Sequence, residues 1–305
     1  MRKIFLLLVT ILLIAGCGQS YEETKRLSKA QRLKLWREDS AAFKIAVMPT
    51  LDCLPVFVAK ERQMFDTAVD IRLKRFTAQM DCDTAIMRNR VEGSITDLVR
   101  AERMMKQGTE LRYFTATNAY WLLISNRLQR IAALKHLDDK MVAMTRYSAT
   151  AMLSDIAVDS AKLKSERVFR IQINDVGIRL KMLENNEMDA LFLTEPHATQ
   201  ALLAKHKVLL DTRQLDLQLG AIVMRSKGMD SPDRKRQMEV FTKGYNEACD
   251  SINKFGVRHY MKLFREYYGV TDQTMKNLPD SLKFAHAAEP RQQDLECAQK
   301  WVSKQ

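Results

Sequence analysis

From residue 43 onward, apolar and polar residues follow two alternating patterns. Short apolar or period-two runs, which are typical of β-strands, are followed by longer segments with apolar residues every three or four positions, which are typical of helices. The pattern predicts strands at 43–48, 69–76, 94–99, 111–117, 120–125, 141–145, 167–173, 188–196 and 207–212, and a strand pair within 215–226. It predicts helices at 52–65, from Asp81 to Gly93, and at 100–108, 146–161, 175–187, 197–206 and from 234 to the end.

This succession of strand, helix, strand, helix predicts an α/β fold with parallel-rich sheets flanked by helices. No stretch of sequence repeats, but the order of elements does. The chain therefore reads as two α/β lobes of similar length followed by a helical C-terminal tail.

The first 42 residues have a different character. Arg2 and Lys3 precede an apolar run, Ile4–Ala15, that is too short to span a bilayer but has the length of a signal-peptide core. The run ends in Ala15-Gly16-Cys17 and resembles the lipobox of bacterial lipoproteins, in which the cysteine is acylated and becomes the mature N-terminus.

That resemblance implies a signal peptide at 1–16, a lipid anchor on Cys17, and a polar tether, partly helical, over 17–42. Several acyl chains would anchor the protein stably to a membrane. The alternatives are an ordinary signal peptide or an apolar anchor with an incidental cysteine.

Composition narrows the class of protein. Of the 305 residues, 46% are hydrophobic and 28% charged, as in water-soluble globular proteins, and no second apolar run could span a membrane. The net charge of +12 is scattered over the chain without a basic block, so nucleic acid is not an expected partner. Anionic lipid headgroups or an anionic ligand fit this charge better.

Four cysteines follow Cys17. An exported protein permits disulfides, so Cys249–Cys297 and Cys53–Cys82 are candidate pairs, and four free buried thiols are an equal alternative. The cysteines and histidines lack the spacing of metal ligands, so neither a metal site nor a cofactor is expected.

The sequence does not predict an enzyme. The five histidines are dispersed, and no motif of a serine hydrolase, P-loop, dinucleotide-binding turn or zinc protease occurs. Asp81 and Asp83 do not share a helix face, so they are expected to cap a helix rather than to form an acid–base pair. No catalytic residue is assigned.

Polar residues do gather where predicted strands end. In open α/β sheets, ligands bind outside the carboxyl ends of the strands, near the free N–H groups of helix N-termini. Five such points occur along the chain: Thr50-Leu51-Asp52, Thr77, Asp97, Tyr147-Ser148-Ala149-Thr150 and Thr194-Glu195-Pro196. Helix caps and a turn are the structural alternatives for these residues.

Four of these stretches, in this order, carry a family resemblance. "KIAVMPTLDCLPVFVAKERQMF", "EGSITDL", "TRYSATAML" and "EMDALFLTEPHA" resemble the periplasmic solute-binding proteins of ABC importers, in the branch with nitrate, sulfonate and thiamine-precursor binders. The resemblance covers residues 43–226. It implies a type II two-lobe fold, with lobe 1 formed by 43–120 and 215–305, lobe 2 by 121–214, and a ligand in the cleft between them.

The resemblance also implies which residues contact the ligand. Those matched to the cleft are Thr50, Leu51, Asp52, Asp97, Ser148, Ala149, Thr150 and Glu195, with Thr77 as a further candidate and Tyr120 and Tyr147 as candidates for stacking. Three acids near a ligand disfavour a simple inorganic anion unless Arg146 or Arg88 compensates. An organic ligand, amine-bearing or heteroaromatic, fits better, and the cysteine-rich motif of pyrimidine-forming relatives is absent.

By this resemblance, the protein is expected to be a monomer in the bacterial cell envelope. It would capture a small solute and deliver it to an ABC permease and ATPase, without a cofactor or covalent chemistry. The main alternative is a lipoprotein that uses the same fold as a sensor or assembly partner, and an envelope enzyme is a third. The sequence leaves the ligand and the choice between inner and outer membrane open.

Overall fold

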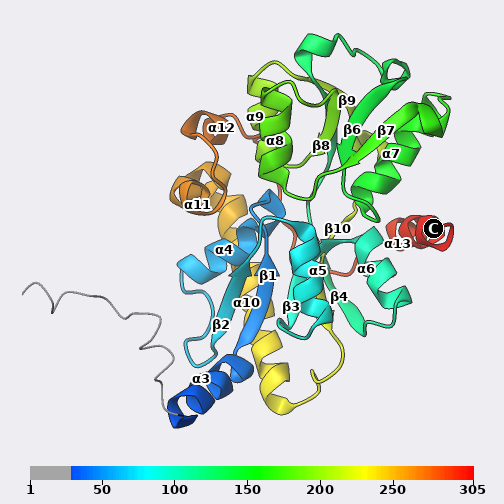
Figure 1. Ribbon diagram of the computed structural model, residues 1–305. Helices are drawn as coiled ribbons and strands as arrows, with labels where there is room; N and C mark the ends of the chain where they lie inside the picture. The colour runs from blue at the N-terminus through cyan, green and yellow to red at the C-terminus, as the bar shows by residue number, and fades with distance from the viewer. Residues whose placement is uncertain (1–28) are drawn as a thin grey trace, which may run out of the picture. The chain divides into compact units, whose positions relative to one another are not determined.

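Two five-stranded sheets organise residues 43–305 (Figure 1). The first has the order β2-β1-β3-β10-β4 and the second the order β7-β6-β8-β5-β9. The computed structural model describes residues 29–305, so the lipobox with Cys17 lies outside the described residues. We call the first sheet with the helices that flank it lobe 1, and the second sheet with its helices lobe 2.

Both sheets follow one topological plan. In lobe 1, β1 runs parallel to β2 and β3, whereas β10 runs antiparallel to β3 and β4. In lobe 2, β6 runs parallel to β7 and β8, whereas β5 runs antiparallel to β8 and β9. The antiparallel strand of each sheet is the one that the chain enters after crossing from the other lobe.

The strands are β1 (Phe43–Val47), β2 (Ile71–Arg75), β3 (Gly93–Asp97), β4 (Leu111–Ala116), β5 (Leu122–Ser125), β6 (Lys140–Met144), β7 (Val168–Gln172), β8 (Ala190–Leu193), β9 (Lys207–Asp211) and β10 (Gly220–Arg225). The helices are α3 (Lys29–Ala41), α4 (Leu54–Glu61), α5 (Gln79–Met87), α6 (Leu98–Lys106), α7 (Ala149–Ser160), α8 (Val176–Glu184), α9 (His197–Leu203), α10 (Pro232–Phe255), α11 (Met261–Tyr267), α12 (Asp272–Lys276) and α13 (Gln292–Ser303). The predicted α/β class with parallel-rich sheets and a helical tail is confirmed. The partly helical character expected of 17–42 appears in α3.

Several helices begin where the sequence has a capping side chain. Asp97, Ser148, Asp175 and Ser231 each accept a backbone N–H in the first turn of α6, α7, α8 and α10. These short polar side chains satisfy N–H groups that have no partner inside the helix. Three of these caps stand at the carboxyl end of a strand or one turn after it.

Four predictions of element boundaries were wrong. The helix expected at 52–65 starts as a 3₁₀ turn at Leu51–Cys53 and ends at Glu61, so Asp52 is not its N-cap. The helix expected to stop at Gly93 ends at Met87, because Asn89 adopts the left-handed conformation that closes helices, and Gly93 instead begins β3.

The strand pair expected within 215–226 is the single strand β10, preceded by a 3₁₀ turn at Thr212–Leu215. A left-handed residue, Asp216, follows that turn, so the alternating apolar residues before Gly220 do not form a ladder. The tail is also not helical throughout, since residues 277–291 separate α12 from α13.

The buried apolar residues form three clusters. One lies in lobe 1 around Phe43, Phe57 and Phe241, and one lies in lobe 2 around Leu191 and Leu193. The third joins Leu98 and Val99 of α6 to buried residues of lobe 2 and to Ala298 and Val302 of α13. The two lobes therefore share apolar contacts beside α13, which Figure 1 shows at the junction of the sheets.

Two crossovers, at 117–121 and 212–219, carry the chain between the sheets. The Thr117 N–H donates to the Gly220 carbonyl at 2.8 Å. A Cβ on Gly220 would lie 2.2 Å from Thr117 Oγ1 and 2.6 Å from Ala119 Cβ. Glycine thus lets the crossover at 117–121 lie close to the start of β10, with Thr117 Oγ1 next to the Gly220 backbone.

The cysteines Cys53, Cys82, Cys249 and Cys297 are free thiols in the structure, so neither candidate disulfide forms. Cys53 and Cys82 lie in different elements of lobe 1, and both are buried. Among the described residues, no helix is both long and apolar enough to cross a membrane.

Candidate ligand-binding site

A small cavity of about 60 Å³ lies between the lobes. Its wall combines the ends of β1 and β3, the crossover, the start of α7 and the loop before α8. The lining residues are Met48, Thr50, Asp52, Gln79, Ile95, Thr96, Asp97, Ala119, Trp121, Thr145, Ser148, Thr150, Asn174, Val176, Arg179 and Thr194. Five predicted site residues are therefore brought together in one wall: Thr50, Asp52, Asp97, Ser148 and Thr150.

Asp52 is an acid in this wall with one buried oxygen that lacks a hydrogen-bond partner in the described part of the chain. Only 6% of the residue is exposed, and its Oδ2 accepts from Thr117 Oγ1 at 3.2 Å. Its Oδ1 is buried, and no described residue donates to it. Burial raises the pKa of Asp52, while the nearby Thr50 and Thr117 hydroxyls act in the opposite direction. A bound group with an N–H or O–H would satisfy Oδ1.

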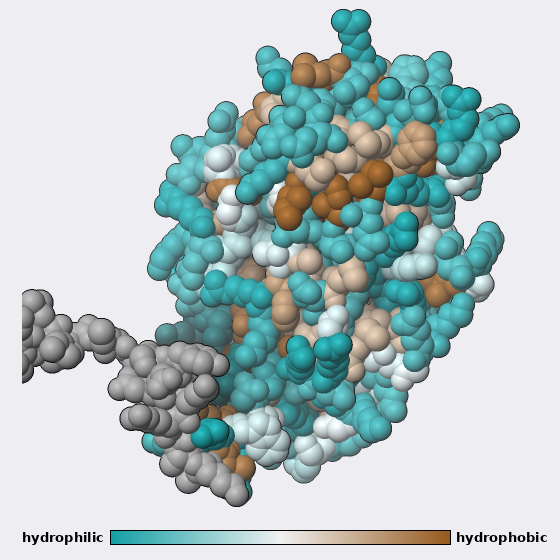
Figure 2. Space-filling view, viewed as in Figure 1, coloured by the Kyte–Doolittle hydropathy of each residue, from teal (hydrophilic) through white to brown (hydrophobic). Residues whose placement is uncertain are grey.

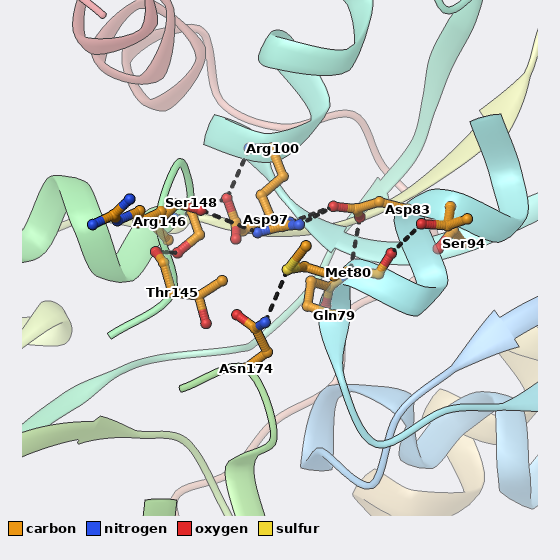
Figure 3. Close-up of polar contacts among 12 residues, drawn as sticks. Gln79, Met80, Asp83, Ser94, Asp97, Arg100, Thr145, Arg146, Ser148 and Asn174 are labelled. Atoms are coloured by element: carbon orange, nitrogen blue, oxygen red, sulfur yellow. Dashed lines mark hydrogen bonds and ion pairs between the residues drawn. The ribbon is translucent and has the colours of Figure 1, made fainter. Parts of the chain in front are cut away.

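Asp97 joins the two lobes. Its Oδ1 accepts the Arg100 N–H at the start of α6 and the Ala149 N–H at the start of α7, each at 3.0 Å. Figure 3 shows Asp97 between Arg100 of lobe 1 and Ser148 of lobe 2. Burial raises the pKa of Asp97 to about 6, although the Arg100 cation opposes that shift. Asp97 is thus both a helix cap and a contact across the cleft.

The Arg100 side chain pairs with Asp83, which Figure 3 shows on the side away from Ser148. Arg100 Nε donates to Asp83 Oδ2 at 2.5 Å, and the two side chains are 7% and 9% exposed. Arg100 Nη1 also donates to the Arg146 carbonyl of lobe 2 at 3.4 Å. Asp83, on α5, therefore holds a buried cation at the edge of the cleft.

Ser148 and Thr150 line the cavity, and Ser148 also caps α7. Ser148 Oγ accepts the Thr150 N–H at 3.1 Å and donates to the Thr145 carbonyl at 2.7 Å. Thr150 Oγ1 accepts the Thr145 N–H at 2.9 Å. For Ser148 the capping and the cavity-lining interpretations both hold, whereas the Thr150 hydroxyl holds the turn that precedes α7.

Glu195 does not line the cavity. Its Oε1 accepts from the Tyr120 hydroxyl at 2.7 Å, and its Oε2 accepts the Thr199 N–H at 3.0 Å. Tyr120 lies under the Arg213 guanidinium and borders a different cavity of about 490 Å³ beside the crossovers. The residue that reaches the interlobe cavity is its neighbour, Trp121.

Four other predicted residues also lie outside the wall. Thr77 is exposed after β2, and Tyr147 is 40% exposed with the Arg103 guanidinium 4.0 Å from the centre of its ring. Leu51 and Ala149 contribute backbone instead. The Leu51 N–H donates to the Glu195 carbonyl of lobe 2 at 2.9 Å. The Ala149 N–H donates to the Asp97 side chain of lobe 1 at 3.0 Å. Leu51, Ala149 and Tyr147 therefore join the lobes.

Neither Arg88 nor Arg146, the two proposed compensating cations, lines the cavity; both are exposed. The cation in the wall is Arg179 of α8, which sequence reasoning missed. Thr96, Asn174 and Trp121 were missed too, although each stands within three residues of a strand end. Among residues 29–305, no group of three or more His, Cys, Asp or Glu side chains is placed to hold a metal ion.

The raised pKa of Asp97 predicts a pH-dependent contribution to stability. Its folded pKa of about 6 exceeds the ordinary value of 3.8, so the folded state binds the extra proton between those values. The contribution of Asp97 to the free energy of unfolding should therefore fall by on the order of 3 kcal/mol as pH rises from about 4 to about 6. Burial lowers the pKa of His197 to about 4, which acts in the opposite direction.

The measurement is the difference between wild type and Asp97→Asn in urea unfolding at pH 4 and pH 7. Asparagine retains the acceptor oxygen but cannot titrate, and His197 is common to both proteins. The free energy of unfolding of wild type minus that of the variant should be larger at pH 4 than at pH 7. An equal difference at the two pH values would mean that Asp97 titrates normally.

Comparison with known proteins identifies structures with a similar fold, but no matching family model and no matching curated protein. No protein-family model matches the sequence, and no curated protein matches it. A ligand-binding component of an ABC-type import system from Staphylococcus aureus, solved with zinc bound, superposes with a TM-score of 0.72 at 15% identity, covering 86% of this chain and 91% of that one.

Two further structures are similar. The periplasmic aliphatic sulphonate-binding protein of Escherichia coli has a TM-score of 0.70 at 15% identity, covering 87% of this chain and 86% of that one. The periplasmic nitrate-binding protein of Synechocystis PCC 6803 has a TM-score of 0.65 at 14% identity, covering 83% and 74%. The chain therefore has the two-sheet fold of the periplasmic solute-binding proteins of ABC import systems.

Proposed function

We propose that this protein is a lipid-anchored extracytoplasmic solute-binding protein. It captures a small organic solute in the interlobe cavity and delivers it to an ABC importer. The observation that carries the proposal is the buried Asp52 Oδ1, which has no partner among the described residues and lies in a cavity lined by both lobes. The fold supports the same function, because the structural neighbours include ligand-binding components of import systems.

The lobes would open and close about the crossovers. The proposed division is lobe 1 at 43–120 and 215–305 and lobe 2 at 121–214, with hinge residues near 118–122 and 213–217. In the structure, hydrogen bonds already join the lobes across the cleft, from Leu51 to Glu195 and from Ala149 to Asp97. Opening would break these few polar contacts and admit the solute.

The contacts around the cavity give no role to a catalytic group. The Ser148 hydroxyl caps α7, and the Thr150 hydroxyl accepts the Thr145 N–H. The buried Cys53 thiol has a pKa raised by burial, which makes it a poor nucleophile. Binding without turnover is therefore the proposed activity. A monomer suffices for it, because both walls of the cavity come from one chain.

The test of this function is a thermal-shift screen of the purified full-length protein against nitrate, sulfonates, pyrimidines, amino acids, polyamines and vitamins. A ligand at 100 times its dissociation constant should add about 2.7 kcal/mol of stability, a rise of several degrees in Tm. Thr150→Trp and Asn174→Trp should abolish the shift by filling the cavity. Ser160→Trp, at the exposed end of α7, should leave it unchanged.

A shift that survives both cavity variants would place the ligand elsewhere. No shift with any class, on protein shown to be folded by circular dichroism, would refute solute capture and favour an assembly partner that uses the same fold. Binding without solute uptake in cells would favour a sensor.

The anchor is a separate proposal, since Cys17 lies outside the described residues. Expression in a bacterial host with radiolabelled palmitate should label the wild-type protein and leave Cys17→Ser unlabelled. Wild type should fractionate with membranes and the variant should not. Label on both proteins, or on neither, would contradict acylation at Cys17.

A further inference from the structure

A cation lines the interlobe cavity without an anionic partner. The Arg179 residue is 4% exposed, and its guanidinium donates to the carbonyls of Ile173 at 2.6 Å and Phe192 at 3.0 Å and to the Thr145 hydroxyl. Among the described residues, no carboxylate lies within ion-pair distance of it. Three of its five N–H groups are used in these contacts, which leaves two for a ligand.

The acid nearest to Arg179 in the chain does not neutralise it. Asp175 caps α8 by accepting the Ile178 N–H at 2.9 Å, and it acts on Arg179 only at longer range. Burial is the main influence on the pKa of Arg179, which it lowers to about 10. A buried guanidinium surrounded by neutral oxygens is costly, and a bound anion would offset that cost.

Asp52 supplies the opposite charge in the same wall. Its Oδ1 is buried without a partner among the described residues, and its Oδ2 accepts from a neutral hydroxyl, that of Thr117. The printed contacts of the two groups do not overlap: Asp52 accepts from Thr117, whereas Arg179 donates to Ile173, Phe192 and Thr145. Among the described residues, the cavity wall therefore has an acceptor and a cation that form no ion pair with each other.

The space between these groups is small. A cavity of about 60 Å³ holds roughly four to six water-sized groups. Thr96 Oγ1 is also buried in this wall, has no partner in the described part of the chain, and can donate or accept one more hydrogen bond. A compact polar molecule would fill the cavity, and a large apolar one would not fit without opening it.

We propose that the solute is a small zwitterion, with an amine N–H bound to Asp52 and a carboxylate or sulfonate bound to Arg179. This inference rests on the proposed function, because it names the class of solute for the same cavity. The ammonium would donate to Asp52 Oδ1, and the anion would accept the two unused Arg179 N–H groups. One to three carbons between the two charges would suit the size of the cavity.

The test is calorimetric titration of the full-length protein with matched compounds. The zwitterions are glycine, β-alanine, γ-aminobutyrate and 2-aminoethanesulfonate. Each is compared with the analogue that lacks the amine, such as propionate for β-alanine, and with the analogue that lacks the acid, such as ethylamine. At least one zwitterion should bind tenfold or more tightly than both of its analogues, since each loses a charged hydrogen bond.

Two variants assign the charges to their residues. Asp52→Asn should raise the dissociation constant of the zwitterion tenfold or more, and it should change that of the anionic analogue by less than threefold. Arg179→Met should weaken the binding of both the zwitterion and the anionic analogue. Arg179→Lys, which keeps the charge, is the second variant if the methionine protein does not fold, and it should bind between wild type and Arg179→Met.

The outcomes separate this inference from the proposed function. Suppose that an anion, an amine or a neutral compound raises the Tm in the screen while no zwitterion binds. The proposed solute class is then wrong, but solute capture stands. The same conclusion follows if the zwitterions bind no more tightly than their anionic analogues. If no compound in either experiment binds to folded protein, solute capture fails together with this inference.

Discussion

Replacing Asp83 by alanine is expected to lower the free energy of unfolding by about 3–5 kcal/mol. The reason is the Arg100 guanidinium, whose Nε donates to Asp83 Oδ2 at 2.5 Å and whose side chain is only 7% exposed. Without the carboxylate, Arg100 would remain buried as an unpaired cation. Urea unfolding monitored by circular dichroism measures the change.

The control is Asp70→Ala. Asp70 pairs with Arg72 at 2.5 Å, but the two side chains are 49% and 36% exposed, so solvent screens the pair and its loss should cost less than about 1 kcal/mol. Asp83→Asn, which retains the shape, is measured if the alanine variant does not fold. A loss at Asp83 no larger than that at Asp70 would show that Arg100 does not depend on the pair.

Phe241→Ala should be similarly destabilising, by about 3–5 kcal/mol, because it empties the centre of the lobe 1 core. The Phe241 ring is fully buried and lies 5.2 Å from Phe114, 5.7 Å from Phe43 and 5.7 Å from Phe65, measured between ring centres. Neighbours from β1 and β4 cannot collapse into the space without distorting the sheet.

Phe255→Ala is the matched control, since it makes the same change on the same helix, α10, at a residue that is 54% exposed. It should lower the free energy of unfolding by less than about 1 kcal/mol. Thermal and urea unfolding of both variants give the comparison. Equal losses would contradict the position of α10 against the sheet.

The Asp83–Arg100 pair lies beside the contacts that join the two lobes at the cleft. Figure 2 shows a mostly hydrophilic face with hydrophobic residues gathered in a band over lobe 2. The contacts that join the lobes at the cleft are few and polar, and Arg100 contributes one of them to the Arg146 carbonyl. Weakening the Asp83–Arg100 pair should therefore affect the Arg100–Arg146 contact between the lobes as well as stability.

Local sequence rules predicted the parts of the site that local geometry determines. Asp97 and Ser148 stand where a strand ends and a helix begins, and their capping depends on neighbours within a few residues. Since the carboxyl ends of the parallel strands meet at one edge of each sheet, these residues could be grouped from sequence. Their position in one cavity wall then follows from the fold.

Contacts between distant residues could not be predicted in this way. Glu195 looks like a free acid at a strand end, but Tyr120 from the crossover occupies one of its oxygens. Tyr120 and Trp121 are consecutive residues, but Tyr120 borders the larger cavity and Trp121 lines the interlobe cavity. A shift of one residue would change which of the two side chains faces the interlobe cavity. The sequence pattern does not determine that side.

Arg179 shows the same limit for a helix. An arginine within an amphipathic helix normally lies on its solvated face, and nothing near it in the sequence indicates burial. The structure buries it because carbonyls from Ile173 and Phe192 and the Thr145 hydroxyl converge on its guanidinium. Those acceptors come from three different strand ends, and only the folded sheet brings them together.

The most direct test of solute capture between the lobes is hydrogen–deuterium exchange, followed by mass spectrometry, with and without a ligand from the screen. Backbone amides in 49–54 and 96–101 of lobe 1 and in 146–152 of lobe 2 should all exchange more slowly when the ligand is bound. Slower exchange confined to 213–218 and 281–285, which border the larger cavity, would contradict binding between the lobes.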